Sequence, residues 1–181
     1  MGDTIKLGFI LTVVCVIAAG SLAKVYEITK VRIERNMVEL NEKKRKYIFP
    51  QAAAFEEKKI DGTSIFTGKD AQGQVIGSIF SVAPRGYGGT INITIGVNPM
   101  GAVAAVSITK LDQTETPGLG VKTTEPKFRD QFKGKEGDTL KLKKDGGSID
   151  AITAATISSR AVANGVHEGV EWYKKAVAGS Q

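Results

Sequence analysis

Seven consecutive residues, 153–159, carry the side chains best suited to hold a phosphate group. They read TAATISS and place four hydroxyl groups just ahead of a segment with the apolar spacing of a helix. The first turn of a helix has N–H groups without intrahelical partners, and the positive end of the helix dipole lies there. Together these groups can bind a phosphate. The alternative is an ordinary cap cluster, in which the Ser and Thr hydroxyls satisfy the first turn.

Three segments, in this order along the chain, resemble motifs of the FMN-binding domain family. Residues 85–91, RGYGGTI, resemble its Gly-Tyr-Gly-Gly segment, and residues 115–122, ETPGLGVK, resemble the loop that lies against the flavin ring. Residues 150–159, DAITAATISS, resemble its covalent flavinylation motif, with Thr156 at the modified position and Ser158 at the closing hydroxyl. Ala154 stands where the family usually has glycine, which is free of the restriction to negative φ.

The resemblance implies covalently bound FMN, joined to the Thr156 hydroxyl by a phosphoester bond. Thr153, Ser158 and nearby N–H groups would position the phosphate, and Ala155 lies within the same motif. The other cofactor-binding residues that it implies lie near the ring: Tyr87, Glu115, Thr116, Gly118, Leu119 and Gly120. Attachment would need a separate flavin transferase that uses FAD. No catalytic residue and no metal ligand is expected.

Hydrophobic spacing and turn residues predict the elements that position these motifs. Period-two alternation and turn residues predict strands at 63–67, 75–82, 91–97, 103–108 and, briefly, 140–142, with turns at 70–73 and 98–101. The strand at 91–97 should have one buried face. A loop is expected at 110–121 and a short helix at 127–132. The last helix, 157–177, should bury Ala161, Val162, Val166, Val170 and Tyr173. These elements predict an α+β domain with a twisted antiparallel sheet packed against the C-terminal helix.

The N-terminus predicts a membrane anchor. Residues 7–23 contain no charge, and at about 1.5 Å per residue they reach about 25 Å, near the thickness of a hydrocarbon core. A short tail, 1–6, precedes this transmembrane helix. A helical connector, 24–50, comes next and ends near Pro50, before the FMN-binding domain at 51–181. A cleaved signal peptide, with a site at Ser21-Leu22-Ala23, is the alternative.

Charge and family resemblance give opposite orientations for the domain. Residues 24–46 carry more basic than acidic side chains, and the positive-inside rule would place the domain after them in the cytoplasm. The resemblance implies a flavin domain on the extracytoplasmic side. Because long domains translocate largely regardless of charge, we follow the resemblance.

Composition excludes several other classes of function. Most of the net charge of +6 comes from residues 24–46, so the remainder has no broad basic face and nucleic-acid binding is not expected. Cys15 is the one cysteine and His167 the one histidine. The chain therefore cannot form an internal disulfide or a cysteine-based metal cluster, and no nucleophile–histidine–acid arrangement can be argued.

A tethered flavin of this kind looks like the G subunits of Rnf complexes, which are ion-translocating ferredoxin:NAD oxidoreductases. The resemblance implies an electron-relay subunit without catalytic activity of its own, in a bacterial or archaeal cytoplasmic membrane. Its partners would be the lipid bilayer and the other membrane and iron–sulfur subunits of the complex. The alternatives are a C subunit of a sodium-pumping NADH:quinone reductase (NqrC-like), a secreted FMN-binding sensory module and a non-redox structural subunit.

Overall fold

A computed structural model describes residues 2–109 and 115–178 of the chain. The chain divides into two compact units, Met1–Lys43 and Lys44–Gln181, and each is described by itself.

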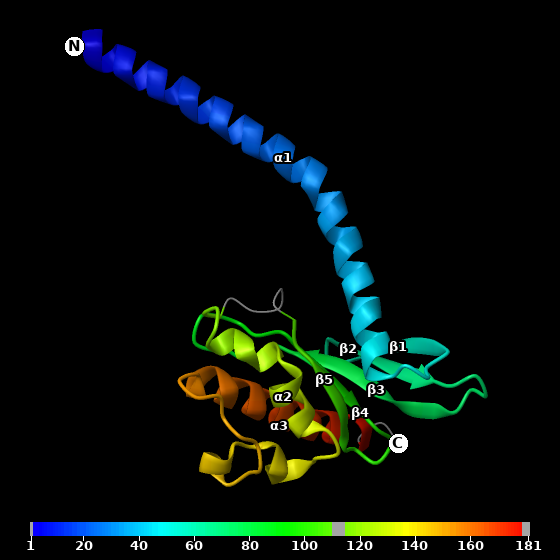
Figure 1. Cartoon of the computed structure of the whole chain (residues 1–181). Helices are drawn as coiled ribbons and strands as arrows, with labels where there is room; N and C mark the ends of the chain where they lie inside the picture. The colour runs from blue at the N-terminus through cyan, green and yellow to red at the C-terminus, as the bar shows by residue number, and fades with distance from the viewer. Residues whose placement is uncertain (1, 110–114, 179–181) are drawn as a thin grey trace. The chain divides into compact units, whose positions relative to one another are not determined.

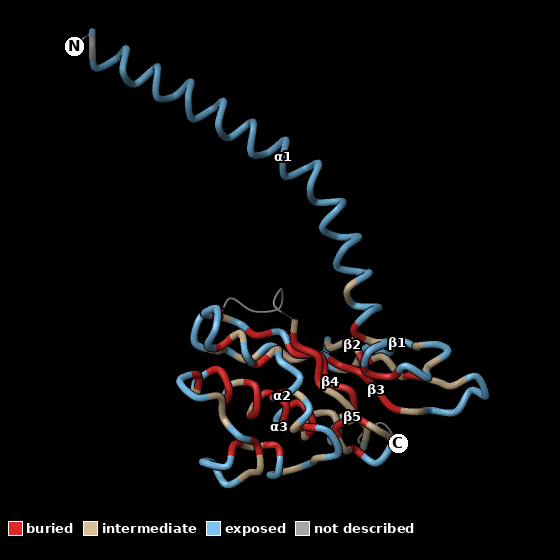
Figure 2. The backbone as a smooth tube through the Cα atoms, in the orientation of Figure 1, coloured by how far each residue is buried: buried red, intermediate tan, exposed pale blue. Residues whose placement is uncertain are grey.

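The first unit consists of most of a long helix, α1 (Gly2–Ile48). It contains a stretch long and apolar enough to cross a membrane. Its described residues are exposed except Leu40, which is partly buried, as the largely pale blue tube of Figure 2 shows. The prediction of a helix that continues past residue 24 and ends near Pro50 is confirmed. An ion pair between Glu39 and Lys43, 2.6 Å, spans one turn of this helix.

The second unit contains a five-stranded antiparallel sheet in which each strand pairs with the next along the chain (Figure 1). Its strands are β1 (Ala54–Ile60), β2 (Thr63–Lys69), β3 (Val75–Val82), β4 (Ile93–Val97) and β5 (Val103–Ser107). The predicted antiparallel sheet is confirmed, and so are the turns at 70–73 and 98–101. β1 was not predicted from the sequence; it is an edge strand whose central residues, EEKK, are charged and exposed.

One face of the sheet packs against the C-terminal helix, α3 (Thr156–Ala178), to form the main core. Val162, Val166 and Val170 are completely buried there, which confirms the predicted buried face. Tyr173 stacks on Phe80 of β3, with ring centroids 5.3 Å apart.

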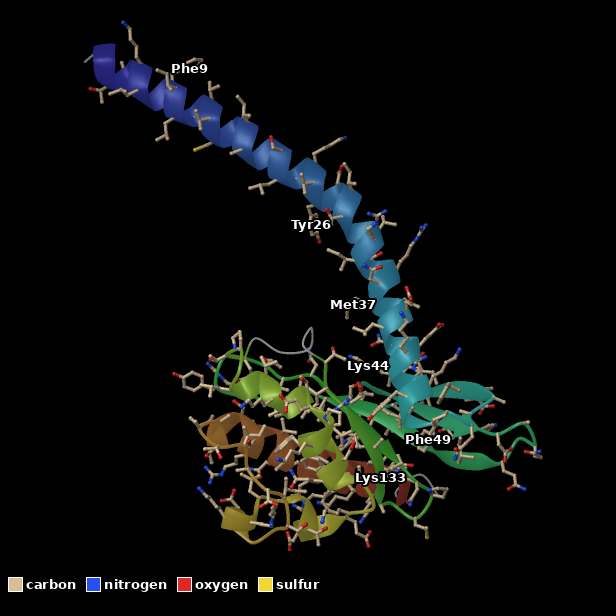
Figure 3. The ribbon with its side chains drawn as sticks, in the orientation of Figure 1. Phe9, Tyr26, Met37, Lys44, Phe49 and Lys133 are labelled. Carbon is tan, nitrogen blue, oxygen red and sulfur yellow. The ribbon has the colours of Figure 1, made fainter. Side chains whose placement is uncertain are left out.

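The opposite face of the sheet is covered where α1 ends, because Ile48 and Phe49 pack against Ile79 of β3. Figure 3 labels Phe49 at this end of the helix. Gly96 of β4 pairs with Ile79, and a Cβ added to Gly96 would lie 2.1 Å from Cγ2 of Ile48. All five residues of β4 are therefore buried, so the prediction of one buried face was wrong. The alternating pattern identified the strand, but Gly96 faces Ile48 instead of water, and Thr94 is buried as well.

Short helical turns fill the segment between the sheet and α3. They are η2 (Gly120–Thr124), α2 (Pro126–Arg129), η3 (Asp130–Phe132), η4 (Gly137–Leu140) and η5 (Lys143–Asp145). The predicted helix at 127–132 is confirmed as α2 and η3 together. The predicted loop at 110–121 ends earlier, because Gly120 and Val121 belong to η2, and residues 110–114 lie outside the described residues.

The predicted brief strand at 140–142 was wrong. Leu140 ends η4, and Leu142 makes only an isolated parallel bridge with Ile149. Both leucines are buried, so their spacing reflects burial. Nearby glycines explain the difference: Gly137 and Gly146 adopt positive φ, which favours turns over an extended strand.

Candidate functional site

The start of α3 presents backbone N–H groups that have no partner among the described residues. In the part of the chain that the structure describes, the N–H groups of Thr156, Ile157 and Ser158 have no hydrogen-bond acceptor. Ala155, the residue before the helix, has no side-chain oxygen to cap them. Such a helix start can accept an anion.

The hydroxyl groups of the 153–159 run divide into two pairs. Ser159 donates to the carbonyl of Ala155 (2.9 Å) and accepts from the N–H of Ile152 (3.0 Å), and Ser158 donates to Glu115 (2.8 Å). Neither serine caps the free N–H groups, so an ordinary cap cluster does not describe this helix start. Among the described residues, the Thr153 and Thr156 hydroxyls have no partner.

Three segments far apart in the sequence meet at this helix start. A cavity of about 610 Å³ lies between them. Its lining residues are Tyr87, Glu115, Thr116, Leu119, Gly120, Ala154, Ala155, Thr156, Ile157 and Ser158. The structure thus brings together eight of the ten cofactor-binding residues expected from the sequence.

Thr153 and Gly118 do not line this cavity. Thr153 is exposed and borders two smaller cavities beside it. Gly118 has a φ of +79° in a tight turn, where the N–H of Leu119 donates to the carbonyl of Thr116 (3.2 Å). Pro117 and Gly118 are the central residues that a type II turn favours, so Gly118 shapes the loop.

Ala154 and Ile157 also line the cavity, although neither was predicted as a cofactor-binding residue. Ile157 was discernible, because it is an isolated apolar residue within a run of small and hydroxyl residues. Ile157 is 56% exposed as a residue, and Tyr87 and Leu119 are 70% and 41% exposed. Apolar side chains exposed around one cavity are typical of a ligand site with an apolar face.

Glu115 lies at the floor of the site and is 6% exposed. One of its carboxylate oxygens, Oε1, accepts hydrogen bonds from the N–H groups of Tyr87 (2.8 Å) and Gly88 (3.3 Å). The other, Oε2, accepts the hydroxyl of Ser158. The carboxylate therefore accepts hydrogen bonds from both of the other segments that line the cavity.

Ala154 has a φ of +61°, in the left-handed region that favours glycine. It is one of two non-glycine residues with positive φ in the described chain; the other is Asp61, of a type that tolerates this region better. The alanine noted in the sequence thus occupies a conformation that suits the glycine usual at this position.

Two ion pairs lie close to the helix start. Arg160 Nε donates to Asp145 Oδ2 (2.7 Å), and this hydrogen bond holds the pKa of the Asp145 carboxyl below its usual value. Lys143 is paired with Asp150 (2.8 Å). These two cations are already engaged by carboxylates, so the unpartnered N–H groups are the more available partners for an anion.

Comparisons with known proteins agree with this arrangement. A family model described as the FMN-binding domain matches residues 86–171, which include all three segments around the cavity. In structure, the chain is similar to the C subunit of the Na⁺-translocating NADH-quinone reductase from Parabacteroides distasonis. The TM-score is 0.50, with 26% identity over 62% of this chain and 61% of that one. Fold and site together define an FMN-binding domain.

Relatives with similar sequences identify the family of subunits to which this FMN-binding domain belongs. The G subunit of the proton-translocating ferredoxin:NAD⁺ oxidoreductase complex of Clostridium ljungdahlii is 34% identical over 89% of this chain and 86% of its own length. The G subunit of an ion-translocating oxidoreductase complex of Methanosarcina acetivorans is 33% identical over 90% of both chains. The chain belongs to the family of G subunits of these ion-translocating oxidoreductase, or Rnf, complexes.

The residues present fit FMN. The cavity volume of about 610 Å³ lies within the usual range of small-molecule sites. Unpartnered N–H groups at one end suit a phosphate, and the exposed side chains of Tyr87, Leu119 and Ile157 suit an aromatic ring system.

Proposed function

We propose that the chain carries FMN covalently on Thr156 and relays electrons as a membrane-anchored subunit of an ion-translocating oxidoreductase complex. The relatives' names support the complex, since they are subunits of ferredoxin:NAD⁺ oxidoreductase and ion-translocating oxidoreductase complexes. Bound FMN would supply the redox chemistry, because it accepts electron pairs and releases electrons singly.

The hydroxyl of Thr156, which has no partner among the described residues, carries the assignment of the attachment site. This residue begins α3 and lines the cavity. Ser158 and Ser159 also lie in the first turn, but their hydroxyls are buried and hydrogen-bonded within the protein. Thr156 is therefore the hydroxyl in this turn that is free to form a bond.

The attachment step requires a flavin transferase and FAD. The Thr156 oxygen forms a bond to the phosphorus on the FMN side of FAD while the bond to the AMP phosphate breaks. AMP leaves, and the threonine hydroxyl proton passes to solvent. The product is a phosphoester, so the helix-start N–H groups face a phosphate that keeps a negative charge.

The membrane part of the proposal rests on α1, which is apolar and long enough to span a bilayer once. We place the FMN-binding domain on the extracytoplasmic side of a bacterial or archaeal cytoplasmic membrane. Cysteine introduced at the exposed turn residue Ala71 in a Cys15→Ser background tests this, using a membrane-impermeant thiol reagent. Labelling in intact cells supports this orientation, whereas labelling only after lysis contradicts it.

Mass spectrometry of the full chain, isolated from membranes of cells that contain the flavin transferase, tests the attachment. The wild-type chain should carry the mass of FMN on the peptide that contains Thr156. Thr156→Ala should abolish it, and Thr153→Ala, which changes an exposed hydroxyl outside the main cavity, is the matched control and should retain it. Covalent flavin on the Thr156→Ala chain would refute the assignment.

A further inference from the structure

Glu115 is a buried carboxylate whose hydrogen bonds come from backbone N–H groups and a serine hydroxyl. In the part of the chain that the structure describes, no lysine or arginine pairs with it. Burying a carboxylate is costly unless donors replace the lost water. The Tyr87 and Gly88 N–H groups and the Ser158 hydroxyl are the donors that replace it.

The surrounding backbone is shaped to admit this carboxylate. A Cβ added to Gly86 would lie 2.2 Å from Oε1 of Glu115, and one added to Gly120 would lie 2.3 Å from Oε2. Any side chain at either position would therefore collide with the carboxylate. Two glycines in loops that are distant in sequence thus lie directly against the same carboxylate, and Gly86 also lies against Ile91.

The bonds of Glu115 connect the three segments that line the cavity. Tyr87 lies 28 residues before it and Ser158 lies 43 residues after it. Without these bonds, each loop would be held to α3 only by its other contacts. A site held in its binding geometry before the ligand arrives loses less conformational entropy on binding.

We propose that Glu115 is a positioning residue that assembles the flavin site before FMN is attached. It fastens the 86–89 loop and its own loop to the first turn of α3, and Ser158 is part of this fastening. The inference rests on the proposed function, and it changes the role expected for two residues. Glu115 acts through its neighbours instead of through the flavin ring, and the Ser158 hydroxyl donates its hydrogen bond to Glu115 instead of to the phosphate.

The first test uses the full chain in detergent, produced without flavin transferase, and measures amide hydrogen exchange at Tyr87. Hydrogen bonds to charged groups contribute about 1.5–3 kcal/mol, so Glu115→Ala should speed exchange at this amide by at least about tenfold. Glu115→Gln keeps a carbonyl oxygen for the amide and should have a smaller effect. The matched control is Tyr173→Phe, which removes a hydrogen bond to Ser78 (2.9 Å) elsewhere on α3 and should leave Tyr87 exchange unchanged.

The second test measures the rate of covalent flavin attachment by the transferase, together with the unfolding temperature of each chain. Glu115→Ala and Ser158→Ala should each slow attachment by about tenfold or more, and the double variant should be no slower than Glu115→Ala, because both changes break one connection. Tyr173→Phe should lower the unfolding temperature without slowing attachment. The control therefore separates loss of positioning from loss of stability.

The outcomes distinguish this inference from the proposed function. If the wild-type chain acquires no flavin, the proposed function fails, and Tyr87 exchange still decides whether Glu115 fastens the loop. If the wild-type chain acquires flavin and Glu115→Ala matches Tyr173→Phe in both exchange and attachment, the positioning role is wrong. Should Glu115→Ala fail to fold, Glu115→Gln and Ser158→Ala are compared with Tyr173→Phe in exchange and attachment instead. If both variants match Tyr173→Phe in both measurements, the positioning role is wrong.

Discussion

Replacing Ala154 with glycine should stabilise the protein, which is an unusual expectation for a substitution that adds backbone freedom. Ala154 has a φ of +61° and an exposed side chain, so the change removes little packing. The left-handed conformation costs a residue with a Cβ about 1–2 kcal/mol. Glycine avoids this cost but loses about 0.5–1 kcal/mol more backbone entropy on folding. The net stabilisation of Ala154→Gly should be about 0.5–1 kcal/mol.

Thermal unfolding of the full chain in detergent, without flavin, measures this effect. For a domain of this size the net gain corresponds to a rise of about 2–4 °C in Tm. The matched control is Ala71→Gly in the exposed turn after β2, because Ala71 lacks the positive φ. This control should lower Tm. A Tm of Ala154→Gly equal to or below that of the wild type, with Ala71→Gly lowered as expected, would refute the argument from backbone strain.

Two further predictions concern the packing and charge of the same domain. Gly96→Ala should destabilise the domain by about 1–3 kcal/mol, because the added methyl would overpack against Ile48. Chemical denaturation should show a smaller loss of stability in an Ile48→Ala background, where the colliding methyl is gone. A cost of the same size in both backgrounds would argue against that contact. Asp145→Asn should lower Tm at pH 7, because the Arg160 hydrogen bond depresses the pKa of Asp145 in the folded chain. This stabilisation exists above the unfolded pKa of about 3.9 and is lost as pH falls through the folded value, so the Tm difference should shrink below about pH 4; a difference independent of pH would contradict it.

The strands and helices that the sequence predicted well are those with a strong pattern of their own. The strand predicted at 75–82, after the turn at 70–73, has the same bounds as β3, and the apolar spacing after Thr156 predicted α3 with its buried valines. β1 was not predicted, because its four central residues are all charged and give no alternation of apolar and polar residues. The burial of Gly96 could not be predicted, because the side chains that cover it come from the end of α1.

The site residues were predictable as a group because glycines and hydroxyls mark all three segments. Their individual functions required the structure. Glu115 was expected beside the flavin ring, but the partners of its carboxylate lie 28 and 43 residues away, and no local pattern encodes such pairs. The positive φ of Ala154 was equally hidden, since alanine gives no signal for that conformation.

The helix that begins in the apolar N-terminal segment supplies, at its other end, two side chains to the second core of the domain. A fragment that begins at residue 51 would lose Ile48 and Phe49 and expose Ile79, Gly77 and Gly96, which these two side chains cover, to water. Such a fragment should aggregate more readily, because an apolar face of its sheet is exposed. A fragment for expression without the apolar segment should therefore begin no later than Lys44, so that the last helical turn still covers this face of the sheet.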